Sequence, residues 1–346
     1  MQVHHPEDAL LRRSPGYVRQ ATALVVTLAV VLGACATGGD RSAEGVPGPV
    51  SSSTAPATTA PDEVDFPPDR PVPFITDEVS WADPTRPTEP VVAGAPSSAD
   101  RPLPTTIRVP EGDGAGPVVV FAHGLGSSPE RFSGLLDAWA RAGYVVVAPR
   151  FPLTSDANPD HNLEVGDQVN LPADVSFVID EVLVASRTPG DPLEGRVDPD
   201  AIGVAGFSLG GGATYALAYS DVSGDPRIRS AAILASAILV EAANVNLSRA
   251  FPLLVIHSTA DEQLPYAYAE GAVSQVAGPV WFATLEGFNH HDPFDDVPTP
   301  VDDAVVGMTT AFWDLTLGDG GVAAAADLGD AADAGGELVS LDVRWE

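Results

Sequence analysis

One serine in this chain has the neighbours that a catalytic nucleophile requires. Ser208 lies in segment 206–210, Gly-Phe-Ser-Leu-Gly, after an apolar run (201–205) typical of a buried strand and before a helix-forming run (213–219). The flanking glycines permit a sharp turn that exposes the hydroxyl at the positive end of the helix. A glycine-rich turn without function is the alternative in a chain with 33 glycines. The strand and helix around it favour a nucleophile, whose chemistry is attack on a carbonyl carbon.

A serine hydroxyl becomes reactive beside a base that takes its proton and an acid that orients the base. The strand that ends at His257 is followed by two acids, Asp261 and Glu262. We predict Asp261 as the acid, because it lies in an Ala-Asp-x-x-x-Pro loop directly after the buried strand. Capping of the next helix is the alternative role for this aspartate. His257 itself is interpreted as structural.

The base is predicted from a histidine pair, His290 and His291, which follows the apolar strand 280–285. Adjacent histidines also occur in metal sites. The nearest acids, in segment 292–296, are too close to the pair in sequence to complete a closed metal site with it without a further ligand. We therefore predict no metal, and we predict no cofactor. His161 lies in a predicted loop, and its neighbours indicate no catalytic or ligand-binding role.

An oxyanion that forms during attack needs two N–H donors. The backbone N–H of Leu209, the residue after the serine, is predicted as the first. We assign the second to Leu125, in the loop 123–128 that follows an early strand. His123 in the same loop is interpreted as a support for the loop.

Apolar runs and helical spacing define the elements that position these residues. The predicted strands are 74–83 (at an edge), 102–109, 117–122, 144–148, 201–206, 231–235, 252–257 and 280–285. The predicted helices are 129–142, 171–185, the one after Ser208, 265–276 and 301–317.

Strands that alternate with helices predict an α/β fold with a doubly wound, mostly parallel sheet. The functional side chains would then meet at the carboxyl ends of the strands. Segment 239–251 is too short for a large lid, so we expect an accessible site. The longer excursion at 151–171 is expected to run along the substrate groove.

Four motifs in this order resemble the α/β-hydrolase superfamily: His-Gly-Leu-Gly at 123–126, Gly-Phe-Ser-Leu-Gly-Gly at 206–211, the Asp261 loop, and Gly-x-x-His at 287–290. More narrowly, residues 100–317 are similar to dienelactone hydrolase, chlorophyllase and platelet-activating-factor acetylhydrolase-like esterases, and to cutinase-like polyester hydrolases. The sequence departs from this pattern at Ser258, because many relatives have glycine at this position, directly after the histidine of the strand.

The resemblance favours His290 over His291 as the base, because it stands three residues after the glycine. It implies hydrolysis of a small-molecule or lipid carboxylic ester through an acyl-enzyme. An inactive hydrolase-fold protein that binds an envelope component is the alternative, and so is the same triad acting on thioesters or peptides.

The chain is strongly acidic, with a formal net charge of −31 from 48 acids and 17 cationic residues, all of them arginines. Such a charge repels phosphate backbones, so nucleic acid is excluded as a partner. Solubility is the simpler use of the acid excess, and we expect a monomer.

The amino-terminal region resembles a bacterial lipoprotein signal. Residues 1–34 combine a basic start with an apolar run that is too short to span a bilayer comfortably, and they end in Leu-Gly-Ala before Cys35, the only cysteine. We predict lipidation of Cys35 and anchoring of an exported protein at the cell surface; a plain secretory signal or a short anchor helix is the alternative. The export route stays open.

The remaining organisation follows from composition. Residues 35–73 are rich in Ser, Thr, Pro and Ala and are predicted to form a disordered tether. Residues 74–317 form the predicted hydrolase domain. Residues 318–346 form an acidic tail that we expect to contain one strand, at 338–345.

Overall fold

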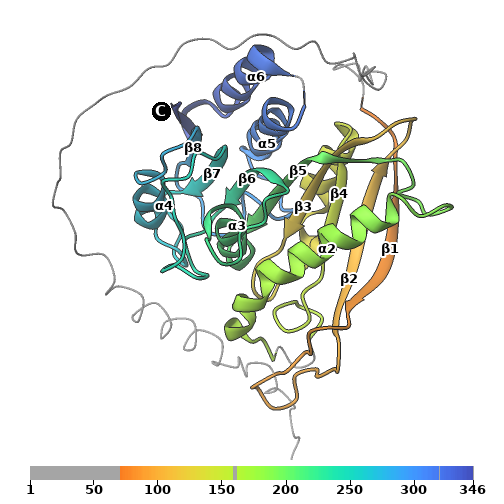
Figure 1. Cartoon of the computed structure of the whole chain (residues 1–346). Coiled ribbons are helices and arrows are strands. Elements are labelled where there is room, and N and C mark those ends of the chain that lie inside the picture. Colours follow the sequence, from red (N-terminus) through yellow and green to blue (C-terminus); the bar gives the residue numbers. More distant parts are fainter. Residues whose placement is uncertain (1–70, 159–161, 319, 346) are drawn as a thin grey trace, which may run out of the picture. The chain divides into compact units, whose positions relative to one another are not determined.

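The computed structural model describes residues 71–158, 162–318 and 320–345. This part of the chain forms one nine-stranded sheet in the order β1-β2-β4-β3-β5-β6-β7-β8-β9. Figure 1 shows its strands running from β1 at one edge to β8 near the other. The strands are β1 (Phe74–Asp83), β2 (Arg101–Pro110), β3 (Gly116–Ala122), β4 (Val145–Pro149), β5 (Val197–Phe207), β6 (Ile228–Leu234), β7 (Leu253–Ser258), β8 (Val280–Leu285) and β9 (Val339–Arg344).

The six strands from β4 to β8 in the sheet order are parallel, whereas β1, β2 and β9 pair antiparallel at the two edges. Central strands such as β4 and β7 are buried along their whole length, because helices cover both faces. The predicted fold class, a doubly wound and mostly parallel α/β sheet, is confirmed.

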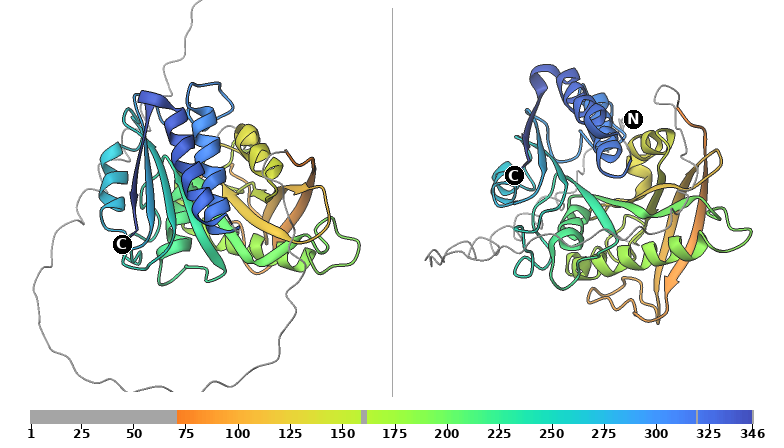
Figure 2. Two further views of the ribbon diagram at one scale, coloured as in Figure 1. Left: turned by 90° about the horizontal axis from the view of Figure 1, so that it is seen from above. Right: turned by 45° about the horizontal axis from the view of Figure 1, so that its top comes forward.

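Two separate cores fill the space between the sheet and the helices. One contains side chains from α2 (Leu171–Ala185), α3 (Leu209–Tyr219) and α4 (Tyr266–Val273). The other contains side chains from α1 (Ser133–Arg141), α5 (Asp302–Thr316) and α6 (Gly321–Ala334). Figure 2 shows α5 and α6 side by side, on the opposite face of the sheet from α2. Short 3₁₀ helices occupy Pro129–Phe132, Val165–Asn170 and Gly336–Leu338.

The carboxyl-terminal segment holds more structure than composition predicted. The expected strand exists as β9, which pairs antiparallel with β8. Helix α6 precedes it and was not predicted. Its apolar residues Ala324, Leu328 and Ala332 recur every fourth position and are buried, and Leu328 and Ala332 join the core that contains α5.

Several predictions from the sequence concern residues outside the described ranges. These are the signal at 1–34, the lipidated Cys35, nearly all of the tether at 35–73, and His161. Within the described ranges, no helix combines the length and the hydropathy needed to cross a bilayer.

The connections at the carboxyl edge differ in length. Residues 235–252, all described, join β6 to β7 without a helix or strand. After β4, by contrast, the chain makes a longer excursion before α2 begins at Leu171. Loops after β3, β5, β7 and β8 reach the same edge, which is where the sequence places its candidate functional residues.

Candidate active site

Ser208 occupies the turn between β5 and α3, in a backbone conformation that is strained for a residue with a side chain. Its φ is 52° and its ψ is −117°. Gly206 and Gly210 make the turn possible: a Cβ on Gly206 would lie 2.3 Å from the Gly210 carbonyl oxygen, and one on Gly210 would lie 2.1 Å from the Ala122 oxygen. The Ser208 residue as a whole is half-buried in this turn.

His290 connects the serine to the acid. Its Nε2 lies 2.9 Å from Ser208 Oγ, and its Nδ1 lies 2.6 Å from Asp261 Oδ2. A carboxylate oxygen accepts, so Nδ1 carries the proton and Nε2 is free to accept from the serine hydroxyl. The ring is buried and lies 4.9 Å from the Phe207 ring, centroid to centroid.

His291 points to different partners. Its Nδ1 lies 3.7 Å from Asp295 Oδ2, and its side chain is about one-third exposed. Asp295 also receives a hydrogen bond from Arg131. The structure therefore brings His290, and not His291, between Ser208 and a carboxylate.

Asp261 is the carboxylate that His290 contacts, while its neighbour Glu262 is exposed. The other oxygen of Asp261, Oδ1, accepts from the backbone N–H groups of Gln263 at 2.9 Å and Leu264 at 2.8 Å. Burial opposes ionisation, but hydrogen bonds from His257, His290 and the Leu264 N–H outweigh it and hold the pKa of Asp261 well below its usual range. The acid is therefore an oriented anion.

The loop 123–128 packs directly against the serine. A Cβ on Gly124 would lie 3.1 Å from Ser208 Cβ. Gly126 N–H donates to Thr154 and Ser127 N–H to Gly124, whereas the N–H groups of Leu125 and Leu209 donate to no acceptor among the described residues. The two predicted oxyanion donors are thus unengaged: Leu209 directly follows Ser208, and Leu125 directly follows Gly124, which packs against it.

His123 ties this loop to the segment after β4. Its Nδ1 donates to the Gly124 carbonyl at 2.8 Å, and its Nε2 accepts from the Phe151 N–H at 3.1 Å. Burial lowers the pKa of His123 to about 4. The ring is therefore neutral near pH 7, in the tautomer that both contacts require.

The excursion after β4 lies against the loop 123–128, and a buried ionic cluster holds its far end. Leu163 Cδ1 would lie 2.9 Å from a Cβ on Gly126. Arg101 binds Asp167 and Asp174 through four hydrogen bonds of 2.6–3.0 Å, and all three side chains are at most 2% exposed. Sequence reasoning missed this cluster, because the partners of Arg101 lie 66 and 73 residues away.

Two further serines hold the site and were not assigned roles from the sequence. Ser236, two residues after the end of β6, donates from Oγ to the Ser208 carbonyl at 2.5 Å. Ser258 Oγ donates to the Phe288 carbonyl and lies 3.1 Å from the Leu285 carbonyl. Ser258 thereby joins the loop of Asp261 to the loop of His290. The only sequence signal for both was a hydroxyl residue at, or two residues after, the end of a buried strand.

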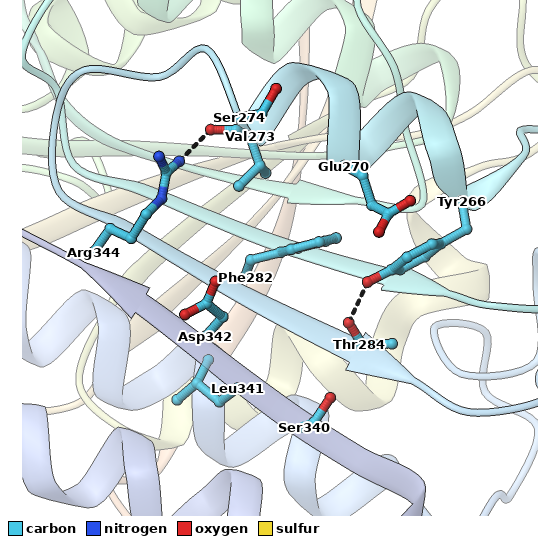
Figure 3. A pocket seen from close by; sticks show the side chains of 10 residues that line it. All are labelled: Tyr266, Glu270, Val273, Ser274, Phe282, Thr284, Ser340, Leu341, Asp342 and Arg344. Carbon is cyan, nitrogen blue, oxygen red and sulfur yellow. Dashed lines mark hydrogen bonds between the residues drawn. The ribbon is translucent and has the colours of Figure 1, made fainter.

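Other features lie apart from these residues. Within the described ranges, His, Cys, Asp and Glu side chains form no group of three or more that could hold a metal ion. Figure 3 shows a hollow of about 550 Å³ between α4, β8 and β9, in which the Tyr266 hydroxyl lies 2.6 Å from Thr284 Oγ1. The residues that line this hollow do not include Ser208, His290 or Asp261.

The chain matches the family model described as Chlorophyllase over residues 85–242. It is also 31% identical to Chlorophyllase-1, chloroplastic, of Citrus sinensis over 123 residues, which are 36% of this chain and 35% of that protein. The chain thus spans about a third of the length of the curated relative it matches. The family match contains Ser208, Leu209 and Leu125 and ends before Asp261 and His290. The protein therefore has an α/β-hydrolase fold and, over residues 85–242, is similar to the chlorophyllases.

Proposed function

We propose that this protein is a serine hydrolase that cleaves carboxylic esters through an acyl-enzyme. The observation that carries the proposal is the continuous path from Ser208 Oγ to His290 Nε2, at 2.9 Å, and from His290 Nδ1 to Asp261 Oδ2, at 2.6 Å. Hydroxyl, imidazole and ionised carboxylate stand in the order that nucleophilic catalysis requires.

The first half of the reaction forms the acyl-enzyme. Ser208 Oγ attacks the ester carbonyl carbon while His290 Nε2 takes the hydroxyl proton, and Asp261 stabilises the resulting imidazolium through Nδ1–H. The N–H groups of Leu125 and Leu209 donate to the oxyanion. Collapse of the tetrahedral intermediate breaks the ester bond, and His290 returns the proton to the leaving alcohol.

The second half releases the acid. Water attacks the acyl carbon, His290 Nε2 takes its proton, and the same two N–H groups bind the second oxyanion. The proton then returns to Ser208 Oγ as the acid departs. This half requires no group beyond those of the first half.

The similarity to a chlorophyllase favours esters over other acyl substrates. The test is a panel of p-nitrophenyl esters of graded chain length, run beside thioester and peptide substrates of matched acyl groups. We expect ester hydrolysis with the highest kcat/KM and no turnover by Ser208→Ala. Faster cleavage of a thioester or peptide would reassign the substrate class, and no turnover of any would favour a binding protein.

We also propose that the protein is an exported, monomeric lipoprotein held at the cell surface by a lipid on Cys35, as the apolar run and the single cysteine suggest. Its ester substrate would then be met at or outside the membrane. Metabolic labelling with an alkyne fatty acid should mark the full chain and leave Cys35→Ala unmarked. Labelling of both would place the lipid elsewhere.

A further inference from the structure

His257, the residue before the last of β7, lies against the same carboxylate oxygen that holds the base. Its Nε2 is 2.8 Å from the Leu264 carbonyl oxygen and 3.3 Å from Asp261 Oδ2. A carbonyl oxygen only accepts, so Nε2 carries the proton. Asp261 Oδ2 consequently has an imidazole N–H on two sides, from His257 and from His290.

We propose that His257 is a positioning residue for the Asp261–His290 pair: its Nε2–H closes the loop 258–264 and faces the oxygen that orients His290. This inference rests on the proposed function. It assigns to His257 a role in setting the geometry of the site, where the sequence suggested only a structural one.

The loop contacts explain why one imidazole has this effect. Oδ1 of Asp261 accepts from the N–H groups of Gln263 and Leu264, and the Leu264 carbonyl is the group that His257 holds. Without His257, the peptide units that supply these donors would lose their anchor at Leu264. Oδ2 would lose the nearby Nε2–H of His257, and the carboxylate would gain rotational freedom.

The surroundings of His257 fit this assignment. Its side chain is fully buried, and its ring lies edge-on to the Tyr266 ring at 6.1 Å. Nδ1 is also buried and has no hydrogen-bond partner within the described ranges. All the polar contacts of the ring in the described part of the chain therefore pass through Nε2, toward the acid loop.

The experiment compares His257→Ala with His257→Gln, whose amide Nε2–H can still reach the Leu264 carbonyl. The first readout is the far-downfield ¹H NMR signal of the His290 Nδ1–H, assigned by its absence in Asp261→Asn. The second is kcat and KM for p-nitrophenyl butyrate. Tyr266→Phe, which removes a neighbouring hydrogen bond to Thr284, is the matched control.

We expect His257→Ala to shift or abolish the downfield signal and to lower kcat by about 10- to 100-fold with little change in KM, because the reacting groups are misplaced rather than removed. His257→Gln should restore both, and Tyr266→Phe should change neither. If the alanine variant fails to fold, His257→Phe fills the volume of the ring without the donor and takes its place.

A folded variant without the donor that keeps the wild-type signal and kcat would overturn the inference. Equal losses in the alanine and glutamine variants, or a wild-type spectrum without a downfield His290 signal, would also overturn it. A wild-type enzyme that shows the signal, loses it in His257→Ala, and yet hydrolyses no ester would leave the placement of His257 standing and refute the proposed function instead.

Discussion

Two polar clusters lie at the carboxyl edge of the sheet, and they use charge in opposite ways. Strand β2 runs antiparallel to β4, so Arg101, at the start of β2, lies beyond the carboxyl end of β4. The positive charge of Arg101 is balanced by ion pairs with Asp167 and Asp174. In the Ser208 cluster, the single carboxylate faces imidazoles, and the Ser208 hydroxyl lies beside the second nitrogen of His290. One arrangement locks a loop, whereas the other keeps a proton acceptor free.

The electrostatics of the two clusters carry the same distinction. Burial alone would lower the pKa of Arg101, but hydrogen bonds to Asp174 and Asp167 outweigh it and raise the pKa above its usual range. Arg101 therefore keeps its charge at any accessible pH. His290, by contrast, has one nitrogen occupied by Asp261 and one directed at Ser208. We infer that the first cluster supports stability and the second supports chemistry.

The largest expected effect separates the two adjacent histidines of the reactive cluster. His290→Ala should lower kcat by about 10³- to 10⁴-fold, because the general base is lost, while leaving the fold intact. His291→Ala should lower kcat less than about tenfold, since its ring faces Asp295. Steady-state kinetics with a p-nitrophenyl ester measure both, and equal losses would remove His290 from its proposed role.

The next prediction tests the cluster of Arg101, Asp167 and Asp174. Arg101→Met should reduce the free energy of unfolding by about 3–5 kcal/mol, because the buried Asp167 loses its arginine partner and the buried Asp174 keeps only Arg86. Arg229→Met, which removes an exposed pair with Asp200, should cost less than about 1 kcal/mol. Urea denaturation provides the measurement. A loss at Arg101 no larger than that at Arg229 would contradict the assigned role.

A third prediction concerns pH and the histidine that supports the oxyanion loop. The pKa of His123 is about 4 in the folded state, against an ordinary value of about 6.5. Between these values the unfolded chain binds a proton that the folded chain does not, so stability falls as the pH is lowered, by roughly 3 kcal/mol at pH 4. His123→Asn keeps an N–H donor without titrating and should lack this contribution.

Urea denaturation of both proteins at pH 7 and at pH 4.5 tests this difference, because all other titrating groups are shared. Parallel pH dependence in the two proteins would show that His123 does not titrate as expected.

The smallest effect is expected at Ser258, which joins the loop of Asp261 to the loop of His290. Ser258→Ala removes the hydroxyl that donates to the Phe288 carbonyl. We expect kcat to fall by about 3- to 10-fold and the free energy of unfolding by about 1–2 kcal/mol, as for one buried hydrogen bond. Kinetics that match the wild type would show that the two loops are aligned without this contact.

Local patterns predicted most of the fold. Buried strands appear as apolar runs, and helices such as α1 show the spacing of one apolar face, so their order was predictable. Helix α6 was missed because its buried face consists of alanines and one leucine in an acidic, glycine-rich segment. The helix is recognised only from its packing against α5, because the composition of the segment does not indicate a buried face.

The candidate site divides in the same way. Ser208, Asp261 and His290 were predicted because each follows a buried strand within a few residues, and the structure brings them within hydrogen-bond distance. Their catalytic roles stay predictions. Arg101 and Ser236 were not found, because their partners lie 66–73 and 28 residues away and leave no local pattern.

The most direct test of the reactive cluster is labelling with a fluorophosphonate, which reacts only with an activated serine. Intact-mass and peptide analysis should find one adduct per chain, on Ser208, with no adduct in Ser208→Ala and much slower labelling in His290→Ala. A folded protein that stays unmodified, or that carries the adduct on another residue, would contradict the proposed serine hydrolase.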